Sequence, residues 1–92
     1  MKDKSSSRRR TIRLAPGRRL RKSAARSAHV LSSPNGPVQL NETAARILAL
    51  CDSTRTREEI VARILALHSD SLASDVGEFL DAALRRGWIL EA

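Results

Sequence analysis

In Val38-Gln39-Leu40-Asn41-Glu42-Thr43-Ala44-Ala45-Arg46-Ile47-Leu48-Ala49-Leu50-Cys51-Asp52, an alternating pattern gives way to a helical one, and this change decides the fold. Val38 and Leu40 alternate with Gln39, which is the period of a half-buried strand. The apolar residues that follow lie at i, i+3, i+4 and i+7, on one face of a helix: Ala44, Ile47, Leu48 and Cys51. Asn41 stands at the changeover, where its side-chain oxygen can accept from the free amides of the first helical turn. The stretch predicts a strand followed directly by a capped helix over about residues 42–51.

A small antiparallel sheet is predicted before this helix. Residues 29–32 form its clearest strand, and residues 18–28 show a weaker extended pattern. The segment Ser33-Pro34-Asn35-Gly36 has Pro at its second and Gly at its fourth position, which is typical of a type I turn. Pro37 has no amide hydrogen and therefore fits the first residue of an edge strand. We predict two or three strands, with Val38–Leu40 at an exposed edge.

Two more helices are predicted after a short break at residues 52–55. Thr56 and Glu59 have the spacing of a capping box, with Thr56 at the start of a helix that ends near His68. A polar residue within 69–74 is expected to cap the next helix. That helix should end at a glycine, Gly87, because the position after a helix is often left-handed.

The last apolar segment, Trp88-Ile89-Leu90, is predicted to pack back as a short strand. The fold class is therefore α+β and mainly helical. A small N-terminal antiparallel sheet of two to three strands is followed by three helices and a short C-terminal strand. Elements in this order resemble a winged helix-turn-helix.

Charge divides the chain unevenly. The net charge of +7 arises entirely from residues 1–26, which carry +10, whereas residues 27–92 carry −3. We expect residues 1–14 to be a basic, disordered arm and residues 15–92 to be a single domain. The arm would steer the chain toward an anionic partner.

The remaining composition argues against several classes of protein. No apolar run is long enough for a signal sequence or a membrane span, and the single Cys51 fits a reducing compartment, so we expect a cytoplasmic protein. Cys51 lies on the inner helix face and is expected to be buried rather than reactive. One Cys and two separated His residues do not suggest a metal site. We therefore predict no metal, no cofactor and no catalytic residue. A domain this small would gain buried area by dimerising.

The charge pattern argues against nucleic acid as a partner, and a winged-helix DNA-binding regulator stays open as the alternative. The later helix of a helix-turn-helix normally offers cationic or amide groups to the major groove. Here its polar side carries Asp75, Glu78 and Asp81, with Arg85 and Arg86 only at its far end. These carboxylates would be repelled by phosphates. A structural dimerisation module is a second open alternative.

An ordered series of segments resembles a known family. The segments are Arg19-Leu20-Arg21, Val30-Leu31-Ser32-Ser33-Pro34-Asn35-Gly36, Leu40-Asn41-Glu42-Thr43-Ala44-Ala45-Arg46-Ile47-Leu48, Cys51-Asp52, residues 56–60 and Phe79-Leu80-x3-Leu84-x2-Gly87-Trp88. On these residues, over about 14–90, the chain resembles the PqqD family of pyrroloquinoline quinone (PQQ) biosynthesis. It departs from the usual family pattern at Ser23 (usually Asp), at Asn35 (often Glu) and at Ser53 (usually Gly).

The resemblance implies a recognition element for the precursor of a ribosomally made peptide. Proteins of this family are peptide chaperones that bind the precursor PqqA and present it to PqqE, a radical S-adenosylmethionine (SAM) enzyme. They are not enzymes in this picture. The resemblance therefore predicts PqqA and PqqE as partners.

Strand addition supplies a mechanism for peptide binding. The edge strand Val38–Leu40 would offer unpaired amides and carbonyls to an extended peptide. The resemblance places the opposite wall on the first half of the third helix. Of the residues nominated there, Val76, Phe79 and Leu80 fit a plain core role equally well. The predicted peptide-binding residues are Val38, Gln39, Leu40, Asp75, Val76, Phe79 and Leu80.

Overall fold

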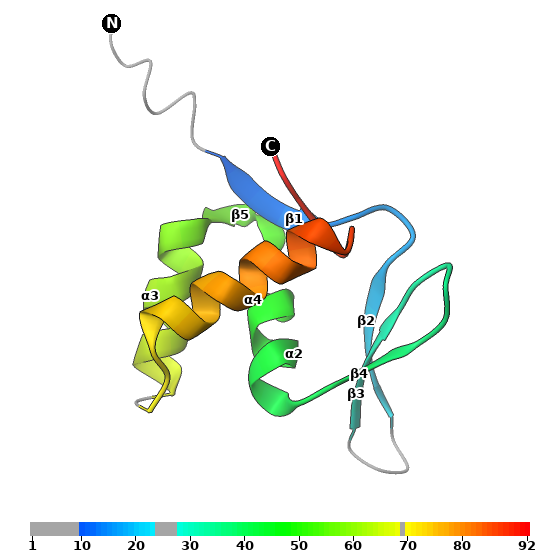
Figure 1. Ribbon diagram of the computed structural model, residues 1–92, viewed down its shortest axis with the longest axis horizontal. Coiled ribbons are helices and arrows are strands. Elements are labelled where there is room, and N and C mark those ends of the chain that lie inside the picture. Colours follow the sequence, from blue (N-terminus) through cyan, green and yellow to red (C-terminus); the bar gives the residue numbers. More distant parts are fainter. Residues whose placement is uncertain (1–9, 24–27, 69) are drawn as a thin grey trace, which may run out of the picture.

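The computed structural model describes residues 10–23, 28–68 and 70–92, and within them it contains three helices and six strands (Figure 1). The helices are α2 (Glu42–Ala49), α3 (Arg57–Leu67) and α4 (Ala73–Arg85). The strands are β1 (Thr11–Leu14), β2 (Arg19–Ser23), β3 (Ala28–Ser32), β4 (Val38–Leu40), β5 (Asp52–Thr56) and β6 (Ile89–Glu91). The fold is α+β, as the sequence predicts.

The strands β2, β3 and β4 form the predicted antiparallel sheet, in that spatial order. Leu20 pairs with Leu31, and Leu31 pairs with Val38, so one apolar row crosses all three strands. Leu31 is fully buried, and its two partners pack against the core. Because side chains alternate along a strand, Arg21, Val30 and Gln39 share the opposite face. The sheet therefore has one face toward the helices and one toward solvent.

A second sheet was not predicted. It has the order β5-β1-β6, so its central strand is Thr11–Leu14. The predicted end of the basic arm at residue 14 is therefore wrong, because Ile12 is fully buried. The predicted break at residues 52–55 is also wrong, since Asp52–Thr56 forms β5. The remaining arm, residues 1–9, lies outside the described residues, as does Ala24 of the weaker predicted strand.

The predicted cap of α2 is confirmed. The Asn41 side-chain oxygen accepts from the Ala44 N–H at 2.7 Å. The helix is shorter than expected and ends at Ala49, with Leu50 as its C-cap. Cys51 follows the helix, and its thiol donates to the Ile47 carbonyl at 3.2 Å. This residue is buried without being helical.

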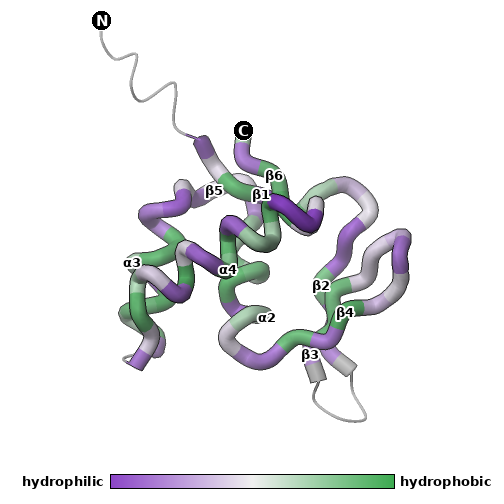
Figure 2. Tube along the Cα trace, in the orientation of Figure 1, coloured by the Kyte–Doolittle hydropathy of each residue, from purple (hydrophilic) through white to green (hydrophobic). Residues whose placement is uncertain are grey.

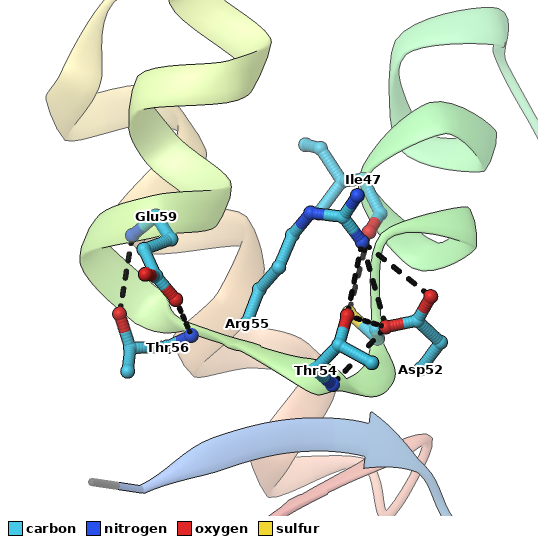
Figure 3. Close-up of polar contacts among 7 residues, drawn as sticks. Ile47, Asp52, Thr54, Arg55, Thr56 and Glu59 are labelled. Atoms are coloured by element: carbon cyan, nitrogen blue, oxygen red, sulfur yellow. Dashed lines mark hydrogen bonds and ion pairs between the residues drawn. The ribbon is translucent and has the colours of Figure 1, made fainter. Parts of the chain in front are cut away.

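The capping box of α3 is also confirmed. The Thr56 N–H donates to the Glu59 carboxylate at 2.8 Å, and the Glu59 N–H donates to the Thr56 hydroxyl at 3.2 Å (Figure 3). These two bonds satisfy amide donors that a helix start leaves free. They fix the point at which β5 turns into α3.

The helix α4 begins without the predicted polar cap. Its N-cap residue is Leu72, which makes no side-chain capping bond, whereas Ser69 lies outside the described residues. Its end follows the prediction. Gly87 has a φ of 75°, and the N–H groups of Gly87 and Trp88 donate to the carbonyls of Leu84 and Ala83 at 3.1 and 2.9 Å. This Schellman motif turns the chain into the predicted final strand, β6.

An aliphatic core joins both sheets to the helices. Its fully buried large side chains are Ile12, Leu31, Leu48, Ile60, Ile64, Leu80 and Ile89. The rings of Phe79 and Trp88 lie at its margin, with centroids 6.4 Å apart. Figure 2 shows hydrophobic positions along α2, α3 and β6, and hydrophilic ones in the turn between β3 and β4. Within the described part of the chain, no helix has the length and apolar character required to cross a membrane.

Candidate functional site

A groove of about 320 Å³ opens beyond the end of β4, between the first halves of α2 and α4. The residues that line it are Asn41, Thr43, Ala44, Ile47, Asp70, Ser71, Asp75, Val76 and Phe79. Asn41 directly follows the last residue of β4. An extended peptide that lies alongside β4 and continues past its last residue would therefore enter this groove.

The strand β4 is the outer strand of its sheet, since among the described residues it pairs only with β3. At the turn of the hairpin, the Gly36 N–H donates to the Ser33 carbonyl at 2.9 Å. Successive residues of an antiparallel ladder turn their N–H and C=O groups alternately toward the partner strand and away from it. The Ser33–Gly36 pair is hydrogen-bonded, and the Val30–Gln39 pair lies three positions further along the same ladder. By this alternation, the N–H and C=O groups of Gln39 point away from β3. An extended peptide can bond to them there.

The predicted binding residues on β4 suit this arrangement. The Gln39 side chain is exposed, whereas Val38 and Leu40 are half-buried and pack against the core. These two residues hold the strand in place, and Gln39 presents the open edge. On α4, Asp75 is exposed and Phe79 is half-buried, and both line the groove.

The other two predicted residues on α4 lie in the core. Val76 is 2% exposed and reaches the groove only as part of its wall. Leu80 is fully buried and does not line the groove, so its predicted contact with a peptide is corrected to a core role. The reason is helical spacing: Val76, Leu80 and Ala83 form the stripe of α4 that faces the other helices.

Four polar residues of the groove were not predicted as site residues: Asn41, Thr43, Asp70 and Ser71. Asn41 was recognised only as a helix cap. Asp70 and Ser71 belong to the connection between α3 and α4, and its position against α2 depends on how the three helices pack. No pattern in the sequence indicated that this connection would lie close to α2.

The groove has an acidic rim and an apolar floor. Asp70 and Asp75 are exposed, and neither forms an ion pair with another described residue. Ile47, Val76 and Phe79 supply apolar surface between them. Leu72, next to Ser71 in the chain, is 60% exposed. The groove is therefore suited to an extended peptide with apolar side chains and a cationic one.

Catalytic chemistry finds little support among the described residues. Burial raises the pKa of the Cys51 thiol from 9.0 to about 12, with a smaller contribution from the Asp52 charge. A thiol held in this way is a poor nucleophile. No cluster of His, Cys, Asp or Glu in the described ranges could hold a metal ion.

The Asp52 carboxylate has a structural role instead. It accepts from the Thr54 N–H and hydroxyl, and it pairs with Arg55 at 3.4 Å (Figure 3). The bond from the Thr54 hydroxyl is the main cause that lowers the Asp52 pKa. These contacts stabilise the start of β5, where Ser53 has a φ of 75°.

Residues 28–89 match the family model described as coenzyme PQQ synthesis protein D (PqqD). This span is more than half of the sequence. The chain belongs to the PqqD family. Ser53, a position at which the sequence departs from the expected family pattern, has a left-handed backbone, a conformation that favours glycine.

Relatives of the PqqD family align along most of the chain. The "PqqA binding protein" of Methylococcus capsulatus is 38% identical over 81 residues, which is 87% of each chain. The "PqqA binding protein" of Azotobacter vinelandii is 41% identical, over 83% of this chain and 85% of its own.

Solved structures agree with this assignment. The PqqD part of Methylobacterium extorquens PqqCD, described as a stand-alone recognition element for ribosomally synthesised and post-translationally modified peptides, has a TM-score of 0.61 and 28% identity. The match covers 86% of this chain and 87% of that one. The heterocyclase TruD shares the fold, with a TM-score of 0.66 and 17% identity over 90% of this chain but only 12% of its own.

Proposed function

We propose that this chain is a peptide chaperone of PQQ biosynthesis, which binds the precursor PqqA by strand addition to β4. The observation that carries the proposal is the outward-facing backbone of Gln39 at an edge that leads into the groove beside α4. Its family and the names of its relatives support PqqA as the ligand.

Main-chain bonds to Gln39 would supply the register of the bound peptide. The next peptide residues would enter the groove, where Val76 and Phe79 offer apolar surface and Asp75 accepts a cationic group. The rest of the peptide would stay outside the groove. It would then be free for presentation to PqqE, the radical SAM enzyme, while this chain itself carries out no reaction.

Three finer features belong to the same proposal. In this proposal, the three helices and the β2–β4 sheet pack in the arrangement of a winged helix-turn-helix fold. The chain is placed in the cytoplasm, where Cys51 stays reduced. It forms a homodimer, because a small domain gains buried area by pairing. Light scattering after size-exclusion chromatography measures the last of these directly.

The test is a calorimetric titration of PqqA into the protein. We expect a dissociation constant in the nanomolar to micromolar range. Gln39→Pro removes an outward donor without removing a bond to β3, so it should weaken binding about tenfold. Gln39→Ala keeps the N–H and is the matched control, which should bind almost as tightly as the original chain.

Circular dichroism of both variants must match that of the original chain, so that lost affinity is not lost folding. Equal affinity of the folded Gln39→Pro variant would rule out strand addition at β4. Absence of any binding of PqqA to the original chain would overturn the proposed function as a whole. Duplex DNA is the comparison ligand, and we expect no binding of DNA under the same conditions.

A further inference from the structure

A second groove, of about 540 Å³, lies beside β2, at the opposite edge of the same sheet from β4. Its lining residues are Leu14, Arg18, Arg19, Leu20, Arg21, Leu48, Ala49, Cys51 and Asp52. Among the described residues, β2 pairs only with β3, so β2 is the second edge of the sheet. The proposed PqqA site at β4 shares no residue with this groove.

The charge of this groove is strongly positive. Arg18, Arg19 and Arg21 line it, and none of them forms an ion pair with another described residue. The carboxylate of Asp52, which also lines the groove, is paired with Arg55, and the Arg55 charge offsets its own.

One of these cations is held in place by the fold. Arg18 is half-buried, and its Nη1 donates to the Pro16 carbonyl at 3.1 Å. Its Nη2 lies 3.5 Å from the position that a Cβ at Gly87 would occupy, and its buried Nε has no hydrogen-bond partner among the described residues. The guanidinium is thus fixed beside the turn after α4 rather than free in solvent.

The edge of β2 has two chemically different faces. Arg19 and Arg21 are exposed on the outer face, whereas Leu20 is half-buried on the face toward α2. A strand added to β2 would place alternate side chains on these two faces. Acidic residues would lie next to Arg19 and Arg21, and apolar residues would lie next to Leu20 and Leu48.

We propose that the groove beside β2 binds an acidic segment of a partner protein, extended and alternating between acidic and apolar residues. Nucleic acid fits less well, because the apolar side chains of Leu14, Leu20 and Leu48 cannot donate hydrogen bonds to phosphates. Binding here leaves β4 free. The chain would then hold two extended segments at once, one on each edge of the sheet.

The probe is an acetylated and amidated peptide that alternates Glu and Leu over about seven residues, roughly the length of a strand. It is titrated into the isotope-labelled full chain while amide NMR spectra are recorded. We expect shifts at Arg19–Arg21 and at Leu48–Asp52, with little change at Val38–Leu40. The same peptide with Gln in place of Glu should bind about tenfold more weakly.

Charge reversal supplies the matched variants. The double change Arg19→Glu and Arg21→Glu should weaken the acidic peptide about tenfold or more. The double change Arg63→Glu and Arg85→Glu alters the net charge equally, at exposed sites outside the groove, and should leave binding within about twofold. Both variants should still bind PqqA at β4, so this proposal can fail while the proposed function stands.

Three results would overturn the inference. The first is an equal loss of affinity in both double variants, which would indicate unspecific attraction. The second is a set of shifts confined to β4 and α4. The third is tighter binding of a short single strand of thymidines than of the acidic peptide, which would assign the groove to nucleic acid.

Discussion

The two sheets of this small domain differ in how the chain builds them. The sheet β2-β3-β4 joins strands that follow one another, and its residues pair across short connections such as Leu31 with Val38. The sheet β5-β1-β6 joins the two ends of the described chain, so that Ile12 pairs with Glu91 and Thr11 pairs with Thr56. One sheet is local, and the other is long-range.

The difference separates stability from recognition. In the long-range sheet, Ile12 and Ile89 are fully buried, so its formation completes the core. The local sheet contributes Leu31 to the core, and among the described residues its outer face and both edges are open, with one groove beyond the end of β4 and another beside β2. Residues of the long-range sheet should therefore control unfolding, and residues of the local sheet should control binding.

Substitution of Ile12 should have the largest effect. Ile12→Ala removes a fully buried side chain from the central strand of the long-range sheet and should lower the free energy of unfolding by about 3 kcal/mol. The matched change in the centre of the local sheet is Val30→Ala, at a half-buried position on its outer face, with an expected loss of about 1 kcal/mol. Urea denaturation measures both. Similar losses at the two positions would remove the distinction between the sheets.

A pH titration tests the junction between α2 and the long-range sheet. The Leu14 N–H donates to the Cys51 carbonyl at 3.2 Å, and burial raises the pKa of the Cys51 thiol to about 12. The folded state therefore keeps a proton that the unfolded state loses above its ordinary pKa of 9.0. Stability should be complete below this value and should fall as pH rises toward 12.

The expected loss from Cys51 is about 1.4 kcal/mol at roughly one pH unit above its ordinary pKa. Thermal unfolding followed by circular dichroism across this range gives the slope. Cys51→Ala is the control, because it lacks the ionising thiol and should lose this part of the slope. An identical slope in both proteins would mean that the thiol is not held in its protonated form.

The cap between β4 and α2 should have the smallest of the three effects. Asn41→Ala removes the acceptor for the Ala44 N–H and should cost about 1 kcal/mol of stability. Asn41→Asp keeps a side-chain oxygen at the cap and should stay close to the original chain. Chemical denaturation separates the two variants. A cost for Asn41→Ala as large as that for Ile12→Ala would show that the local sheet also controls unfolding.

Much of the local structure could be predicted because its signals lie close together in the sequence. The capping box of Thr56 and Glu59, the Asn41 cap and the turn before Pro37 each depend on contacts within a few residues. The strand β1 escaped prediction because its four residues include only one fully buried side chain, contain Arg13 and directly follow Arg10. Its partners β5 and β6 come from distant parts of the chain.

The residues of the candidate site likewise fall into those that the sequence predicted and those that only the tertiary structure revealed. The edge strand Val38–Leu40 and the nomination of Asp75 and Phe79 came from the sequence and its family resemblance, and the structure places the last two in one groove. The burial of Leu80 and the entry of Asp70 and Ser71 into the groove depend on how α4 packs against α2 and α3. Helical spacing alone could not say which part of an apolar stripe faces a groove.

The sequence by itself determined where strand gives way to helix, which residues cap α2 and α3, and that Val38–Leu40 ends a hairpin at an edge. Periodicity and capping are properties of neighbouring residues, so they can be read without the fold. The tertiary structure alone decided that β1 closes a second sheet and that one groove lies beyond the end of β4 and another beside β2. Those features arise from contacts between distant segments, for which a single sequence carries no local signal.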